Sequence, residues 1–157
     1  MFEVTPPALA THTFLSGMPG GQLDTLAAVA TDVTFPARHR IFEEGGHASR
    51  FWLIRSGSVL LDLRVPGRGP VVVEPVCMGQ LLGWSWLFPP FRWAFGAVAD
   101  GPVTAFELDA AAVRACCAAD PALGYELTRR LAEVVARRLE ATRTRLLTTS
   151  SRLEGQY

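Results

Sequence analysis

Residues 79–99 read GQLLGWSWLFPPFRWAFGAVA, and this stretch is the most informative part of the sequence for predicting the fold. Gly79 and Gly83 let backbone amides turn toward an anion, and Arg92 can add a charge-assisted contact. The aromatic and proline residues at 84–91 also suit an apolar cap over a core, with Arg92 paired to a surface carboxylate. The residue types therefore leave two uses open, an anion-binding loop and a structural cap.

Short patterns of alternating apolar residues lie on both sides of this stretch. Residues 58–63 alternate, and the turn at 66–70 joins them to a hairpin partner at 71–76. Further strands are expected at residues 33–35, 39–42, 51–55 and 103–108. Many short strands with turns at close intervals predict a β-sandwich or a small barrel.

Helical patterns stand at both ends of the chain. One helix is expected over residues 22–30, and Asp109 is a good N-cap for a second over 110–118. Asp120-Pro121 starts a third, which runs to about residue 148. Its apolar stripe consists of Leu127, Leu131, Val134, Val135, Leu139, Thr142 and Leu146. The stripe suits packing against the chain's own core, and its length also predicts a dimer interface.

Composition excludes several classes of protein. The 157 residues suit one compact domain, and 49% hydrophobic with 19% charged residues is too little charge for a disordered chain. Fifteen basic and fifteen acidic residues give a net charge of zero, so a whole-domain basic field for nucleic acid is absent. No secretory signal is visible, and the apolar run at 75–91 is broken by glycines and prolines. We expect a cytoplasmic protein without a membrane partner.

Catalytic and metal-binding motifs are weak. Cys77, Cys116 and Cys117 are odd in number and lack the paired spacing of a zinc site. The histidines and glutamates within residues 39–47 are the only candidates for a cupin-like metal site, and a solvated turn is the simpler interpretation. Cys77 is a possible haem ligand, but a small buried residue on a strand is the simpler interpretation of this cysteine. We expect no enzyme, no cofactor and no metal.

Residues 79–99 resemble the phosphate-binding cassette of the cyclic-nucleotide-binding domain family, the sensor module of catabolite activator-type regulators. That cassette opens with Gly-Glu-Leu-Ala/Gly and closes with Arg-x-Ala-Thr/Ser. Gly79-Gln80-Leu81-Leu82 stands at the opening, and Arg92-Trp93-Ala94-Phe95 stands at the close. The similarity covers residues 14–148, including Ile41–Gly45 as an early strand and turn.

The resemblance implies a mainly β fold with flanking helices. This is an antiparallel double-stranded β-helix, or jelly-roll, with an N-terminal helix and a long C-terminal dimerisation helix. Residues 1–13 are expected to be a loose N-terminal segment, 14–148 the cyclic-nucleotide-binding-like domain with its C-terminal helices, and 149–157 a tail. By the same resemblance, the ligand-binding residues are Gly79, Gln80, Leu81, Leu82, Arg92, Trp93, Phe95, Thr142 and Arg143. Thr142 or Arg143 stands where the family's long helix reaches the base.

Two positions depart from the family's cassette. Gln80 replaces the glutamate that accepts from the ribose hydroxyl, which keeps an acceptor but loses the charge. Phe95 replaces the hydroxyl residue that donates to the phosphate. The interval from Gln80 to Arg92 is also long and apolar, so the resemblance predicts a divergent pocket.

The resemblance implies a non-enzymatic sensor that binds cyclic AMP or a related cyclic nucleotide and passes the signal through its last helix. The alternative is a protein-interaction and dimerisation module without nucleotide, in which the Trp-rich cassette is a partner surface. A homodimer through the last helix and an unidentified protein partner are expected. Because the chain ends at Tyr157, where the family's regulators continue into a helix-turn-helix domain, no direct DNA binding is expected unless a companion chain supplies that domain.

Overall fold

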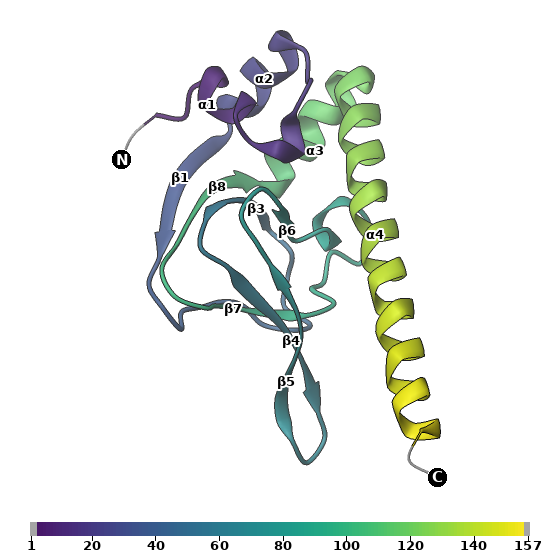
Figure 1. The fold of residues 1–157 in the computed structure, drawn as a ribbon. Coiled ribbons are helices and arrows are strands. Elements are labelled where there is room, and N and C mark those ends of the chain that lie inside the picture. Colours follow the sequence, from purple (N-terminus) through teal and green to yellow (C-terminus); the bar gives the residue numbers. More distant parts are fainter. Residues whose placement is uncertain (1–2, 156–157) are drawn as a thin grey trace.

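The computed structural model describes residues 3–155, which form a β-barrel flanked by helices (Figure 1). The helices are α1 (Pro6–Ala10), η1 (Thr13–Leu15), α2 (Gly20–Ala27), η2 (Ser85–Leu87), α3 (Ala110–Ala119) and α4 (Pro121–Glu154). The strands are β1 (Ala30–Phe35), β2 (Arg40–Phe42), β3 (Arg50–Ser56), β4 (Val59–Val65), β5 (Gly69–Val76), β6 (Leu81–Leu82), β7 (Gly96–Ala99) and β8 (Val103–Asp109).

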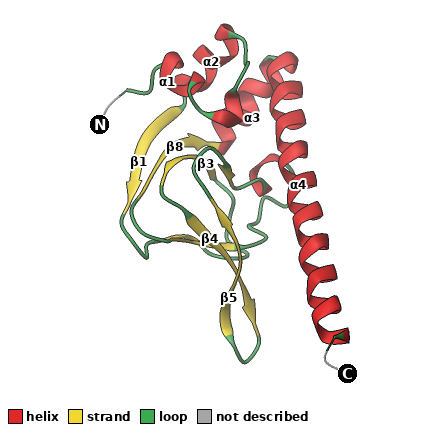
Figure 2. Cartoon of the chain, viewed as in Figure 1, coloured by secondary structure: helices red, strands yellow, loops and turns green. Residues whose placement is uncertain are grey.

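The strands form two antiparallel sheets of four strands each, in the orders β1-β8-β3-β6 and β2-β7-β4-β5. Sequential neighbours such as β1 and β2 lie in different sheets, which is the connectivity of a double-stranded jelly-roll. Figure 2 shows the strands gathered into this barrel, with the N-terminal helices at one end and α4 along one side. The predicted fold class is confirmed.

Large apolar side chains are buried on both faces of the sheet that contains β3 and β8. Trp86, Phe51 and Phe106 are the bulkiest fully buried ones; Phe51 and Phe106 lie on the face opposite to Trp52, whose ring stacks on Phe42 of the other sheet. Trp86 stacks on Phe51 with ring centroids 4.1 Å apart. Part of the Trp-rich cassette is therefore core, as the structural-cap interpretation requires.

The two C-terminal helices begin where their capping residues predict. The Asp109 carboxylate accepts from the Ala112 amide at 2.8 Å at the start of α3. The Asp120 carboxylate accepts from the amides of Ala122 and Leu123 at the start of α4. Each side chain satisfies amides that lack an intrahelical partner, which fixes the first residue of the helix.

Helical residues occur within both the expected N-terminal segment and the expected tail. Within residues 1–13, α1 is capped by the Thr5 hydroxyl, and Val4 and Leu9 are buried. At the other end, α4 continues past residue 148 to Glu154. Residues 1–2 and 156–157 lie outside the described part of the chain. No helix within residues 3–155 is long and apolar enough to cross a membrane.

Candidate functional site

The cassette begins at a sharp turn that leads into β6. Gly79 has φ +84°, and its amide donates to the Ile54 carbonyl at 2.9 Å. Leu81 and Leu82 follow as β6, pair with β3, and are fully buried. The side chains of these two predicted ligand residues are therefore part of the hydrophobic core.

The Gln80 side chain forms a hydrogen bond within its own turn. Its Oε1 accepts from the Cys77 amide at 2.7 Å, which closes the turn between β5 and β6. The residue is exposed and lies at a different cavity from Trp93 and Phe95. The structure thus gives the Gln80 carbonyl a partner within its own turn.

Arg92 is exposed on the loop before β7. Its Nη1 donates to the Gly45 carbonyl at 3.3 Å, and its backbone forms an isolated bridge with His47. Arg92 lines neither the small cavity beside Trp93 nor the larger groove beside α4, and no carboxylate within residues 3–155 forms a salt bridge with it. Its contact is to a backbone carbonyl, so the expected surface carboxylate partner is absent from the described residues.

Trp93, the next residue, points the opposite way and fills the barrel. Its indole is only 6% exposed and stacks on Phe42 with centroids 4.0 Å apart. Trp52 lies on the same cluster, with its ring 6.1 Å from that of Trp93. A side chain at Gly83 would approach the Trp93 ring to 2.8 Å, so the turn at the end of β6 is shaped to accept the indole.

Little space remains beside Trp93. A cavity of about 10 Å³ is lined by Phe42, Leu61, Gly83, Trp84, Ser85, Trp93, Ala94, Phe95 and Arg138. That volume is near the minimum for one water molecule. Phe95 is half-buried here and packs against the core, as expected for an aromatic ring in place of a hydroxyl residue.

The structure does not bring Thr142 and Arg143 to this cavity. Both lie on the exposed half of α4, and the Thr142 hydroxyl donates to the Arg138 carbonyl of its own helix. The residue of α4 that reaches the cavity is Arg138, whose Nη2 donates to the Leu81 carbonyl at 2.9 Å. Burial lowers the pKa of Arg138, and the nearby Glu74 carboxylate partly opposes that effect.

Of the nine predicted site residues, Trp93 and Phe95 meet at this cavity, whereas Gly79, Gln80 and Leu81 lie at a separate groove. Sequence reasoning missed Arg138, Phe42 and Leu61. Arg138 stands one helical turn before Thr142, and that spacing was the available signal. No group of three His, Cys, Asp or Glu side chains suited to hold a metal occurs within the described range.

The apolar stripe of α4 splits into two faces. Leu123, Leu127 and Leu131 are buried, and α4 packs against α3. The exposed face repeats every seven residues, with large side chains at Tyr125, Leu139, Leu146 and Leu153 that are 60–68% exposed. A seven-residue repeat supplies one of the two apolar positions per heptad that the seam of a two-stranded coiled coil uses.

The chain is similar to known proteins over most of its length. The family model described as cyclic nucleotide-binding domain matches residues 32–120. A curated relative, the CRP-like cAMP-activated global transcriptional regulator of Mycobacterium tuberculosis, is 28% identical over 138 residues, which are 88% of this chain. The aligned part spans only 60% of the length of that relative.

Solved structures have the same fold. A candidate cyclic nucleotide-binding protein of Geobacter metallireducens superposes with a TM-score of 0.78 at 27% identity, over 87% of this chain and 98% of the other. The catabolite activator protein of Thermus thermophilus superposes with a TM-score of 0.69 at 22% identity, over 88% of this chain and 63% of its own.

Proposed function

This chain belongs to the cyclic nucleotide-binding domain family, and we propose that it is a non-enzymatic regulatory module that acts through self-association of α4. In this proposal, the Trp93 indole fills the part of the barrel interior that a cyclic nucleotide would occupy, so the module works without a bound cyclic nucleotide. Of the two functions that the sequence left open, this is the interaction and dimerisation module.

One observation carries the proposal: the Trp93 indole is 6% exposed and stacked on Phe42 inside the barrel. The remaining cavity of about 10 Å³ is far below the roughly 300–1,000 Å³ of small-molecule pockets. A nucleotide would have to displace the indole. Removing a buried tryptophan from a core destabilises a protein by about 3–5 kcal/mol, and a ligand at this position would have to offset a loss of that size.

The polar groups of the cassette support the same conclusion. Gln80 is engaged by the Cys77 amide, and the Arg92 guanidinium is directed to the Gly45 carbonyl on the outer side of the loop. An anion beside Trp93 would therefore find neither of the two polar side chains that the family's cassette offers at these positions.

Self-association is supported by the exposed face of α4. Leu139 is 62% exposed, Leu146 is 64% exposed and Leu153 is 60% exposed, at seven-residue spacing. The same face of a second copy is the simplest complement, because a two-fold axis pairs identical seams. The proposed assembly is a homodimer in which the two α4 helices pair.

A second candidate is a sensor for cyclic AMP or a related cyclic nucleotide. It is favoured by the Mycobacterium tuberculosis relative, which is described as cAMP-activated, and by Arg138, a cation beside the small cavity. This function requires Trp93 to leave the barrel when the ligand enters. The two candidates therefore differ in whether nucleotide changes the protein at all.

Sedimentation velocity with and without cyclic AMP or cyclic GMP tests the proposal. We expect a dimer at tens of micromolar, a concentration chosen from the affinity scale of modest interfaces, with no change on adding either nucleotide. A nucleotide-dependent change in sedimentation would favour the sensor, and a monomer under all conditions would contradict the proposed self-association.

A further inference from the structure

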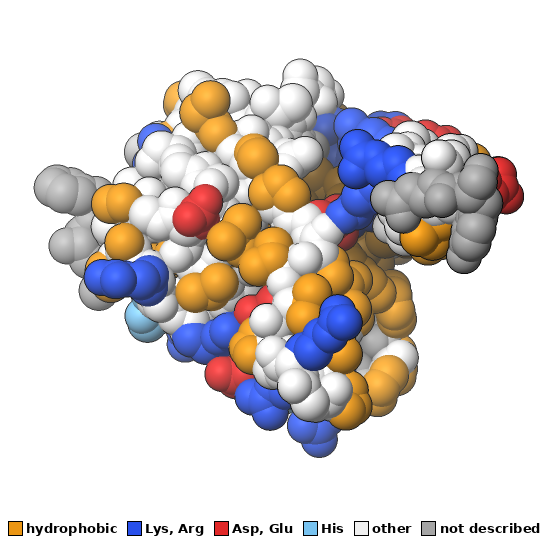
Figure 3. All heavy atoms as spheres, turned by 60° about the horizontal axis from the view of Figure 1, so that its bottom comes forward, with side chains coloured by type: hydrophobic (Ala, Val, Ile, Leu, Met, Phe, Trp, Pro, Cys, Tyr) orange, Lys and Arg blue, Asp and Glu red, His pale blue; other side chains and the backbone are white. Residues whose placement is uncertain are grey.

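A second, larger cavity lies outside the barrel, between α4 and the body of the protein. It has a volume of about 560 Å³ and is walled by α4, by η1 and by the β5–β6 turn. Figure 3 shows arginine side chains along the side of α4 that faces the barrel. The proposed function uses the opposite, exposed seam of α4 and does not involve this groove.

The groove carries an excess of positive charge. Arg129, Arg130, Arg137 and Arg138 line it, against Glu74 and Glu133. Arg129 is neutralised by Glu126 and Glu133, at 3.1 and 2.8 Å. The donors of Arg130 are also occupied, because Arg130 forms a salt bridge with Glu126 and its Nη1 donates to the carbonyls of Phe14 and Ser16.

The other two arginines retain unused donors. The Arg137 Nε donates to the Glu133 backbone carbonyl of its own helix, and the Arg138 Nη2 donates to the Leu81 carbonyl. Within residues 3–155, neither forms a salt bridge with a carboxylate. A guanidinium has five N–H donors, so most of the donors of this pair are available to a ligand.

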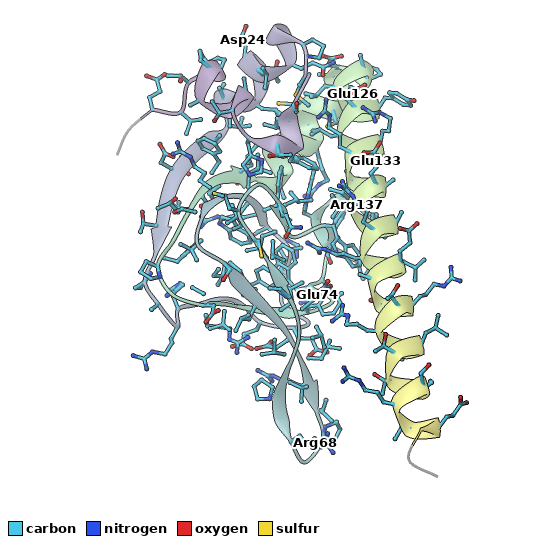
Figure 4. All side chains as sticks on the ribbon, in the orientation of Figure 1. Asp24, Arg68, Glu74, Glu126, Glu133 and Arg137 are labelled. Atoms are coloured by element: carbon cyan, nitrogen blue, oxygen red, sulfur yellow. The ribbon has the colours of Figure 1, made fainter. Side chains whose placement is uncertain are left out.

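Arg138 gives the stronger argument, because it is half-buried between α4 and β6. Taking a cation out of water without a counter-charge is unfavourable, and burial lowers the pKa of this guanidinium. Glu74 is near, but its salt bridge is to Arg145, at 3.6 Å. A bound anion would supply the missing counter-charge. Figure 4 shows Arg137 and Glu133 on the barrel side of α4, with Glu74 across the gap.

We propose that this groove binds a small molecule that carries a phosphate or carboxylate group, with Arg137 and Arg138 as its anion contacts. Planar guanidinium groups bind such oxyanions through paired, charge-assisted hydrogen bonds. The volume lies within the range of small-molecule sites. Phe14, Pro75 and Val134 supply apolar walls for the body of the ligand.

A ligand here would bridge three parts of the fold. Arg138 and Arg137 belong to α4, Phe14 belongs to η1, and Gln80 and Leu81 belong to the start of the cassette. Binding would therefore fix α4 against the barrel. Arg138 lines both this groove and the small cavity beside Trp93, whereas Arg137 lines the groove and not that cavity.

Isothermal titration of the intact chain tests the site with pyrophosphate, ribose 5-phosphate and citrate as probes, and with ribose as a neutral control. We expect saturable binding of at least one anionic probe and none of ribose. Binding of the phosphates alone identifies a phosphorylated ligand, and binding of citrate alone identifies a carboxylate; both outcomes support the site.

The variant Arg137→Gln should weaken that binding by about tenfold or more, because it removes charge-assisted contacts. Arg137 is exposed, so the fold should be retained. Arg143→Gln is the matched control, since it removes the same charge from the same helix away from the groove. Equal weakening by both variants would indicate a general charge effect and overturn the proposal, as would the absence of binding by all three anionic probes.

Discussion

The indole of Trp93 lies nearly parallel to the phenyl ring of Phe42, at 16° and with 4.0 Å between centroids. Phe42 ends β2 and Trp93 closes the cassette, so this contact joins the loop to the barrel interior. Arg92, one residue earlier, faces outward to Gly45. Of these two neighbouring cassette residues, it is therefore the aromatic ring of Trp93, and not the cation of Arg92, that enters the barrel.

Removing the Trp93 ring should leave a cavity in the core. We expect Trp93→Ala to lower the free energy of unfolding by about 3–5 kcal/mol. Added indole should raise the Tm of this variant and leave the wild type unchanged, because an apolar cavity binds an apolar ring of matching size. Phe88→Ala, at a ring that is 46% exposed, should change stability by less than about 1 kcal/mol. Equal stability of the two variants would show that the indole is not part of the core.

Gly83 should be coupled energetically to Trp93. A Cβ at Gly83 would stand 2.8 Å from the Trp93 ring, and the residue has φ +94°. Gly101 has φ +103° with open space around it, so Gly101→Ala measures the backbone penalty alone. We expect Gly83→Ala to cost more than Gly101→Ala, and the excess to shrink in the Trp93→Ala background. A double-mutant cycle should give a coupling of about 0.5–3 kcal/mol, whereas additive effects would contradict the packing.

The exposed seam of α4 should hold the dimer. Changing Leu139 and Leu146 together to Glu places like charges on a face that a second copy would cover, so sedimentation should show a folded monomer. Thr144→Glu combined with Ser151→Glu is the matched control, because it adds the same charges at the same spacing away from the seam. If the control dissociates as readily as the seam variant, net charge and not the seam is responsible.

His12 should make stability depend on pH. Its Nε2 lies 2.8 Å from the Ile54 carbonyl, and its Nδ1 accepts from the Phe14 amide at 3.2 Å. Accepting that amide requires a neutral ring, and burial lowers the pKa of His12 below the ordinary 6.5, with Arg55 adding to the effect. The stabilisation is therefore complete above about pH 6.5 and is lost as the pH falls toward the lower pKa of the folded state.

Thermal unfolding between about pH 5 and 8 measures this effect over the histidine range. His12→Asn keeps an acceptor for the Phe14 amide without a titrating group, so the fall in Tm below about pH 6.5 should flatten. His39→Asn changes an exposed histidine and should retain the slope of the wild type. A slope unaltered by His12→Asn would assign the pH dependence to other groups.

The sequence was sufficient to predict most of the fold. Alternation at residues 58–63 predicted β4, and the caps Asp109 and Asp120 predicted the starts of α3 and α4. The short helix α1 was missed, because five residues that begin with two prolines carry no periodicity. The last turns of α4 were missed because their exposed Ser and Thr residues have weak helix propensity.

The site was harder to predict because its geometry depends on distant contacts. Local sequence does not decide whether Arg92 or Trp93 turns inward, since the preceding loop has no regular period. The choice depends on Phe42 and Trp52, which belong to other strands. The role of Gln80 was likewise hidden, because its side chain is taken by the Cys77 amide within its own turn.

Isothermal titration of cyclic AMP and cyclic GMP into the wild-type chain tests the central claim most directly. With Trp93 stacked on Phe42 and about 10 Å³ left beside it, we predict no saturable heat for either nucleotide at concentrations up to about a millimolar. The intact fold is verified in the same sample by its thermal transition. Saturable binding of either nucleotide at micromolar concentration that is retained in Arg137→Gln, and is therefore not binding at the groove, would contradict the claim that Trp93 occupies the site.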